Sequence, residues 1–310
     1  MDKNSQLSER AYRALREAGI ETQPEQLRFE VRDELCLIHL TEGRIAWFST
    51  SREATELLAR ERRILDLVRQ RSNVRVPSVA YVSADAAFDI RSAVPGVVDV
   101  QLVFEKATRD RDYAKRLGHQ LGELLAELHG SLTAQHVQAW LPQTLEWPLA
   151  RPAVIKNLES VVDDRRLIAR ANDVLKTYET FRTPPEHRVF VHGDVGFHNL
   201  VFDPQNLHLC GIFDFKSAAF ADRHLDFRYL MFDLGRFDLL EAACEAYSAR
   251  TGTSIIRERV LMHNAVWAIS FLAYRAGTPP GELSCGRTLD VDLRWTRAAI
   301  AQVLDLGICP

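Results

Sequence analysis

Hydrophobic residues in the first fifty positions follow two different spacings. Over residues 7–18 they recur every three or four positions, and Gly19 ends the pattern, which predicts a helix. The runs 35–40 and 44–48 are short and largely apolar, and the turn sequence Thr-Glu-Gly-Arg joins them. This part of the chain therefore predicts one helix followed by two paired strands.

A longer helical pattern follows these strands. It begins after the Ser-Thr-Ser sequence at 49–51, a favourable helix start, and continues to Arg71. Glu61 falls in the middle of its apolar face. Residues 77–96 then predict a hairpin that ends at a Pro-Gly pair. Helix, strands, helix and hairpin together make the first part of the chain an α+β unit.

Helical spacing dominates the rest of the chain. Four leucines, from Leu117 to Leu128, form one stripe that Gly130 ends. Further helices are predicted over 159–181, 236–250, 254–276 and 288–306, and strands over 188–191, 200–202 and 207–215. We therefore expect two lobes, 1–95 and 96–310.

Composition excludes several classes of function. The chain has 310 residues, of which 46% are hydrophobic and 26% charged, and its net charge is −3. No block of basic residues stands out that would suit binding to a nucleic acid. The most apolar stretch, 265–274, is too short to span a bilayer, and the polar N-terminus does not resemble a secretory signal. Five scattered cysteines without a Cys-x-x-Cys pair indicate free thiols. We expect a cytoplasmic monomer or homodimer without nucleic-acid or membrane partners.

Three oxygen-bearing side chains stand close to predicted strand ends. Asp194 and Asn199 lie between two apolar runs, and an Asp-Pro-Gln-Asn turn at 203–206 predicts a hairpin that returns Asp214 toward them. Such ligands suit Mg²⁺, and a remaining carboxylate could accept a proton from an attacking hydroxyl. Phosphoryl transfer needs these parts. The alternative is that Asp194 forms only a turn and Asn199 only a cap.

The same stretch resembles a known family. "HGDVGFHN" (192–199) is similar to the H-G-D-x-x-x-x-N catalytic loop of the aminoglycoside phosphotransferase and choline kinase group. "IFDFKSAAFADRHLDF" (212–227) resembles its metal motif and following D-x-x-x-D segment, and "LGELLAELH" (121–129) its leucine-rich helix. The resemblance implies a bilobal, eukaryotic-protein-kinase-like fold with a small β-rich N-lobe and a larger, mainly helical C-lobe. It also implies transfer of the γ-phosphate of ATP to a hydroxyl of a small molecule.

The resemblance further implies a role for each matching residue. Asp194 corresponds to the catalytic base, and Asn199 and Asp214 to the Mg²⁺ ligands. Behind the loop it places three bracing residues, His192, Asp222 and Asp226. At the ATP site it places Glu61, Trp47, Ser92 and Val94, the last of which begins a Val-Pro-Gly hinge. Asp222 and Asp226 could instead cap the next helix.

One position departs from the family pattern. The family carries a Lys or Arg on the strand before the glutamate's helix, and Trp47 stands at that position here. Arg44 is an odd number of positions away, so it belongs to the opposite strand face. Because a buried Glu61 without a partner would be costly, either another cation reaches it or it is more exposed than its position indicates.

Two other functions remain open on sequence alone. A pseudokinase-like nucleotide- or ligand-binding protein without turnover would account for Trp47. A metal-dependent phosphohydrolase would use the His- and Asp-rich region 192–226, although such enzymes need closely spaced His ligands.

Acidic residues in the C-terminal part suggest one class of acceptor. They could form a wall that holds a cation such as an aminoglycoside, a basic peptide antibiotic or a choline-like molecule. They could equally be solvated helix faces. The set comprises Glu241, Glu245, Glu282, Asp290 and Asp292.

Overall fold

The computed structural model describes residues 3–21, 23, 29–32, 35–145, 150–232, 236–277 and 288–307. The chain divides into two units: Met1–Val98 together with Asn199–Lys216, and Asp99–His198 together with Ser217–Pro310. Each unit has its own set of elements, and we call them the first and the second unit.

The first unit is built on a five-stranded antiparallel sheet in the order β1-β2-β3-β5-β4. Ser51 caps the start of its long helix by accepting the N–H of Ala54, as the Ser-Thr-Ser sequence predicted. The elements are α1 (Lys3–Glu17), β1 (Phe29–Arg32), β2 (Leu35–His39), β3 (Arg44–Ser49), α2 (Arg52–Arg71), β4 (Ser78–Val82) and β5 (Phe88–Ser92).

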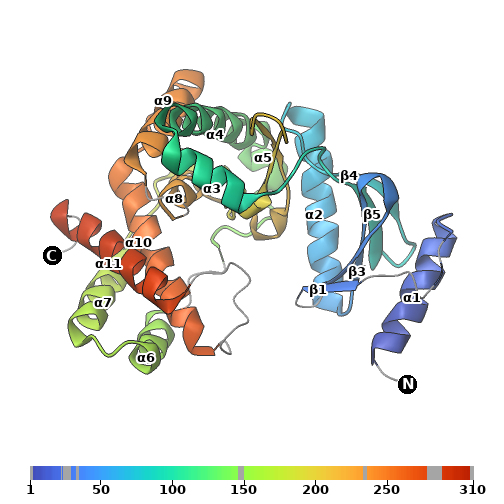
Figure 1. Cartoon of the computed structure of the whole chain (residues 1–310), viewed down its shortest axis with the longest axis horizontal. Coiled ribbons are helices and arrows are strands. Elements are labelled where there is room, and N and C mark those ends of the chain that lie inside the picture. The colour runs from blue at the N-terminus through green and yellow to red at the C-terminus, as the bar shows by residue number, and fades with distance from the viewer. Residues whose placement is uncertain are drawn as a thin grey trace. The chain divides into compact units, whose positions relative to one another are not determined.

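Helices α1 and α2 cover opposite faces of this sheet (Figure 1). Because side chains alternate along a strand, Phe88 and Ile90 of β5 enter the core shared with α1. Asp89 and Arg91, at the alternate positions, point to the other face. On β3 the same alternation places Trp47 in the core shared with α2. One sheet face therefore carries an indole, a carboxylate and a guanidinium beneath α2.

The hairpin of β7 (Leu200–Phe202) and β8 (Leu209–Ile212) belongs to the first unit. Its backbone pairs with the residue after the Val-Pro-Gly sequence, since Val97 and Phe202 exchange two N–H···O bonds. The N–H of Ile212 also donates to the carbonyl of Arg75. A Cβ on Gly211 would lie 2.4 Å from that Arg75 oxygen, so only glycine permits this approach. The sequence prediction assigned this hairpin to 96–310, but these backbone bonds tie it to the first unit.

The second unit is mainly helical. Its only strands among the described residues are β6 (Arg188–Val191) and β9 (Ala219–Asp222), which pair antiparallel. The helices are α3 (Val100–Arg109), α4 (Arg111–Ser131), α5 (Ala134–Val137), α6 (Arg151–Val161), α7 (Arg165–Glu179), α8 (His224–Phe232), α9 (Phe237–Thr251), α10 (Arg257–Tyr274) and α11 (Leu289–Asp305). None of these, within the described parts of the chain, is both long and apolar enough to cross a bilayer.

Two predictions about this unit were wrong in detail. The single helix predicted over 159–181 is two helices, because Asp164 accepts the N–H groups of Arg166 and Leu167 and starts α7 anew. Strand β9 was not predicted, because its four residues, Ala-Phe-Ala-Asp, are too few to show a period.

Candidate active site

Glu61 has the partner that the sequence left unidentified. Its carboxylate is 2% exposed, and Oε2 accepts a 2.6 Å bond from Arg91 of β5. Oε1 accepts the backbone N–H of Phe215 at 2.9 Å. The cation therefore comes from the neighbouring strand, and Arg44 does not supply it, because Arg44 lies beside Glu42. Glu61 links α2, β5 and the segment after β8.

Arg91 is fully engaged within this cluster. Its Nε and Nη2 donate to Asp89 at 2.8 and 3.1 Å, and its guanidinium carbon lies 5.0 Å from the centroid of the Trp47 ring. Asp89 also accepts a bond from Arg62 of α2. Burial alone would raise the pKa of Glu61, but the charge and hydrogen bond of Arg91 outweigh burial and keep the pKa below its usual value.

Asn199 and Asp214 stand at the same end of the β7–β8 hairpin. The carbonyl of Asn199 accepts the N–H of Phe213 at 3.0 Å, one residue before Asp214. Asp214 has a left-handed backbone with φ 66°, and its Oδ2 lies 3.3 Å from Nζ of Lys216. An amide and a carboxylate oxygen are ligands that Mg²⁺ prefers, and the ammonium shows that a cation fits beside this carboxylate. The donor set therefore fits a magnesium ion.

The backbone around Asp194 is held by buried groups of the second unit. Asp226 accepts the N–H groups of His192 and Gly193, both at 2.8 Å, and Arg228 donates to the Gly193 carbonyl at 2.6 Å. The N–H of Asp194 donates to Nδ1 of His192. Gly193 has φ 83°, and a Cβ there would lie 2.3 Å from the Ser217 carbonyl. These contacts fix the turn that presents Asp194.

The carboxylate of Asp194 is partly accessible, with its side chain 28% exposed. Tyr229 donates its hydroxyl proton to Oδ1, and Nε2 of His198 lies 3.4 Å from Oδ2. Burial raises the pKa of Asp194, but His198 and Tyr229 lower it by more, so the pKa stays well below its usual value. The group is ionised at neutral pH, as a proton acceptor must be.

Sequence reasoning missed three residues of α4 and α8 that support this loop. His129, the last residue of the leucine-rich motif at 121–129, bonds Asp226 at 3.0 Å and the hydroxyl of Tyr247 at 3.1 Å. Arg228 is 1% exposed and lies over the ring of Trp267. The available signal was an arginine inside the apolar run of α8, because a buried cation requires partners. Tyr229, the next residue, carried no signal.

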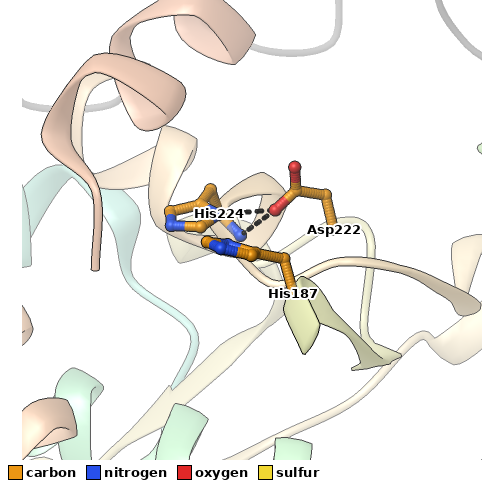
Figure 2. Close-up of side chains that lie close together, drawn as sticks. All are labelled: His187, Asp222 and His224. Carbon is orange, nitrogen blue, oxygen red and sulfur yellow. Dashed lines mark hydrogen bonds and ion pairs between the residues drawn. The ribbon is translucent and has the colours of Figure 1, made fainter. Parts of the chain in front are cut away.

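Asp222 contacts residues of α8 and α10, and not the 192–199 loop that Asp226 holds. Its Oδ1 lies 2.5 Å from Nδ1 of His224, and Arg259 of α10 donates to Oδ2. His187 stacks on His224 at 5.0 Å between centroids, and the three residues have ligand-type atoms within 4.8 Å of one another (Figure 2). The contacts of Asp222 thus go to neighbouring helices, whereas Asp226 contacts the loop itself.

This cluster is poorly suited to a metal. Nε2 of His224 accepts the N–H of Ile256, so the ring proton is on Nδ1. Nδ1 therefore donates that proton to Oδ1 of Asp222. Both nitrogens are therefore used, and the adjacent Arg259 disfavours a second cation. Burial lowers the pKa of His224 to about 4, so its ring is neutral at pH 7. In the part of the chain that the structure describes, this is the one cluster of three His, Cys, Asp or Glu side chains at ligand spacing, so the structure does not favour the phosphohydrolase alternative.

The remaining predicted residues lie in several places. Ser92 ends β5 opposite Arg44, and Val94 is buried near Gly211. In the suggested acidic wall, Glu241, Glu245 and Asp290 are exposed, and Glu282 lies outside the described residues. Asp292 is buried and paired with Arg275, so it cannot form part of such a wall.

Comparison with known proteins identifies the family. The family model described as "Phosphotransferase enzyme family" matches residues 21–262. Among curated proteins, no sequence matches this chain significantly.

Solved structures resemble the chain over nearly its whole length. The GDP complex of wild-type aminoglycoside 2'-phosphotransferase-IIIa is 18% identical, with a TM-score of 0.67 over 97% of this chain and 99% of that one. Macrolide 2'-phosphotransferase from Brachybacterium faecium is 17% identical, with a TM-score of 0.58 over 94% and 97%. The small antiparallel sheet of the first unit and the mainly helical second unit confirm the predicted fold class. The chain therefore belongs to the phosphotransferase enzyme family and is a small-molecule kinase with a protein-kinase-like fold.

Proposed function

We propose that this protein transfers the γ-phosphate of ATP to a hydroxyl group of a small molecule, with Asp194 as the catalytic base. The observation that carries the proposal is the environment of Asp194. Two side chains keep its carboxylate ionised, and Asp226 and Arg228 fix the turn that presents it. A carboxylate held in this way is ready to accept a proton.

In the proposed reaction the acceptor oxygen attacks the γ-phosphorus while its proton passes to Asp194. The bond from that phosphorus to the bridging oxygen breaks, and ADP leaves with the bonding electrons. Asn199 and Asp214 would hold Mg²⁺, which neutralises phosphate charge when it is bound. The pair of Glu61 and Arg91 keeps α2 and the segment after β8 in place, which supports an active kinase over the pseudokinase-like alternative.

For the acceptor we propose a hydroxylated cation. Its support is that structures similar to this chain include a gentamicin complex and a streptomycin–ATP complex of APH(2")-IIa, each 16% identical to it. A macrolide phosphotransferase is equally similar, so the class of acceptor has to be measured. Screening aminoglycosides, macrolides, basic peptides and choline analogues for acceptor-dependent ADP release would decide between these classes.

The role of Asp194 is tested with Asp194→Asn. We expect kcat to fall by about 100-fold or more, the size of a general-base effect, because the amide cannot take the proton. The affinity for MgATP should stay within about threefold of wild type, a change below 1 kcal/mol. Phosphate transfer is followed by coupled ADP release, and binding by calorimetry.

Asp173→Asn is the control, because Asp173 is an exposed residue of α7. It should behave as wild type. A turnover in Asp194→Asn within about tenfold of wild type would contradict the assignment of the base.

A further inference from the structure

Trp47 leaves the nucleotide site of the proposed kinase without its expected strand cation. Protein kinases contact ATP phosphates with a lysine on this strand, and an indole cannot neutralise phosphate charge. Arg91 does not fill the gap. It is 3% exposed, and three of its nitrogens donate to Glu61 and Asp89. With Arg62 on Asp89, the cluster holds two cations and two carboxylates, so it has no net charge to offer.

Lys216 brings a positive charge close to Trp47, the residue that stands where the family has its strand cation. Its Nζ lies 6.0 Å from the centroid of the Trp47 ring and 3.3 Å from Oδ2 of Asp214. Its side chain is 25% exposed, so the ammonium can exchange partners with solvent-borne groups. Arg91 approaches the same ring, but it is buried.

The backbone of Lys216 is fixed from α2. Arg60 donates to its carbonyl at 3.0 Å, and the preceding residue, Phe215, donates its N–H to Glu61. Both anchors lie on the helix whose glutamate pairs with Arg91. The segment that carries Asp214 and Lys216 is therefore attached to the same cluster that a strand lysine would join.

The geometry points to Lys216 as the cation that binds the phosphates of ATP in place of the missing strand lysine. This inference rests on the proposed function. If Asp214 held Mg²⁺, the ammonium of Lys216 would lose its carboxylate partner and would be repelled by the metal charge. The nearest compensating charge is then a phosphate oxygen, and a charge-assisted bond to it would be strong. With the metal site filled, Lys216 would exchange its contact with Asp214 for one with the nucleotide phosphates.

Calorimetric titration of the full chain with MgATP tests the assignment. Lys216→Met keeps the length of the side chain and removes its charge, so MgATP should bind about tenfold or more weakly. Lys216→Arg keeps a cation and should stay within about threefold of wild type. Lys106→Met is the matched control and should bind MgATP as wild type does, because Lys106 also lies over an aromatic ring, that of Tyr113, at 4.6 Å.

A second measurement separates phosphate binding from a structural role. Mn²⁺ alone serves as the probe and is followed through the electron paramagnetic resonance signal of the free ion. Lys216→Met should bind Mn²⁺ more tightly than wild type, because the ammonium no longer competes for Asp214. Opposite changes for Mn²⁺ and MgATP support the inference, whereas weaker binding of both overturns it.

The outcomes also distinguish this inference from the proposed function. If wild type binds MgATP, Asp214→Asn abolishes that binding and Lys216→Met binds as wild type does, only the role of Lys216 is overturned. A loss that Lys216→Arg shares fully with Lys216→Met overturns it as well. If wild type does not bind MgATP, the proposed function and this inference both fall. Circular dichroism checks folding, and Lys216→Gln replaces the methionine variant if that variant is unfolded at the assay temperature.

Discussion

At the scale of single residues, the cation that pairs with Glu61 comes from β5 and not from β3, the strand on which the family carries it. Glu61 keeps a cationic partner although Trp47 occupies the usual position, because Arg91 reaches it from β5. The sequence left two possibilities for Glu61 on its apolar helix face, a cation from elsewhere or greater exposure, and the structure shows the first. The sequence could not indicate which cation, because strand order places Arg91 opposite Ile45 only after β3 and β5 have paired. Long-range register of this kind is invisible to local pattern.

The Asp194 carboxylate gives a prediction at the same scale. Tyr229→Phe removes a hydrogen bond to the ionised form, so the pKa of Asp194 should rise. The acid limb of the kcat–pH profile should therefore move to higher pH. Near pH 8 the loss of kcat should be modest, about two- to tenfold, because the carboxylate remains ionised there.

Tyr178→Phe is the control for this measurement. Tyr178 is also a tyrosine of the second unit, but its hydroxyl bonds His263. The acid limb of the kcat–pH profile of Tyr178→Phe should match that of wild type. An unshifted limb in Tyr229→Phe would mean that this hydroxyl does not influence the ionisation of Asp194.

At the scale of elements, sequence periodicity located most long helices and failed for short ones. Helix α4 was visible because its leucines repeat over several turns, and Leu117, Leu121 and Leu128 are indeed buried. What periodicity did not show is how closely α4 packs. A Cβ on Gly122 would lie 2.2 Å from the carbonyl oxygen of Ala243 in α9. The interface therefore depends on a glycine that the sequence pattern treats as neutral.

Gly122→Ala should accordingly destabilise the protein. Helix propensity favours alanine by about 0.5–1 kcal/mol, but the close carbonyl forces the helices apart, and overpacking of this kind costs roughly 1–3 kcal/mol. Gly130→Ala on the same helix is the matched control, because nothing lies within 4 Å of the added Cβ. It should be neutral or slightly stabilising. Urea unfolding followed by circular dichroism compares the two, and equal stability of both variants would contradict the close packing.

At the scale of the whole molecule, the family resemblance predicted the fold class, but it did not predict how the chain divides. The prediction divided the chain at a single point, after residue 95. In the structure the chain passes between the units after residues 98, 198 and 216, because the β7–β8 hairpin returns to the first unit. The local signal of the hairpin was clear. Its tertiary partners, Val97 and Arg75, are distant in sequence and were not predictable from it.

This division predicts which amides lose protection together. Phe48 is fully buried in the core of the first unit and stacks on Phe88 at 4.4 Å. Phe48→Ala should remove about 3–5 kcal/mol from the stability of that unit. In hydrogen exchange of the full chain, amides of β2, β3 and the 199–216 hairpin should then exchange faster together, while those of α4 and α9 keep their protection.

Gly122→Ala provides the reverse experiment, since its expected effect lies in α4 and α9. It should accelerate exchange in those helices and leave the hairpin protected with β2 and β3. If the hairpin instead follows α4 and α9, residues 199–216 belong energetically to the second unit, as the sequence prediction placed them. If every amide responds to either variant, the two units unfold as one, because a single cooperative transition exposes all of them at the same free energy. Only the selective pattern supports a hairpin whose stability comes from Val97, Arg75 and Glu61 of the first unit.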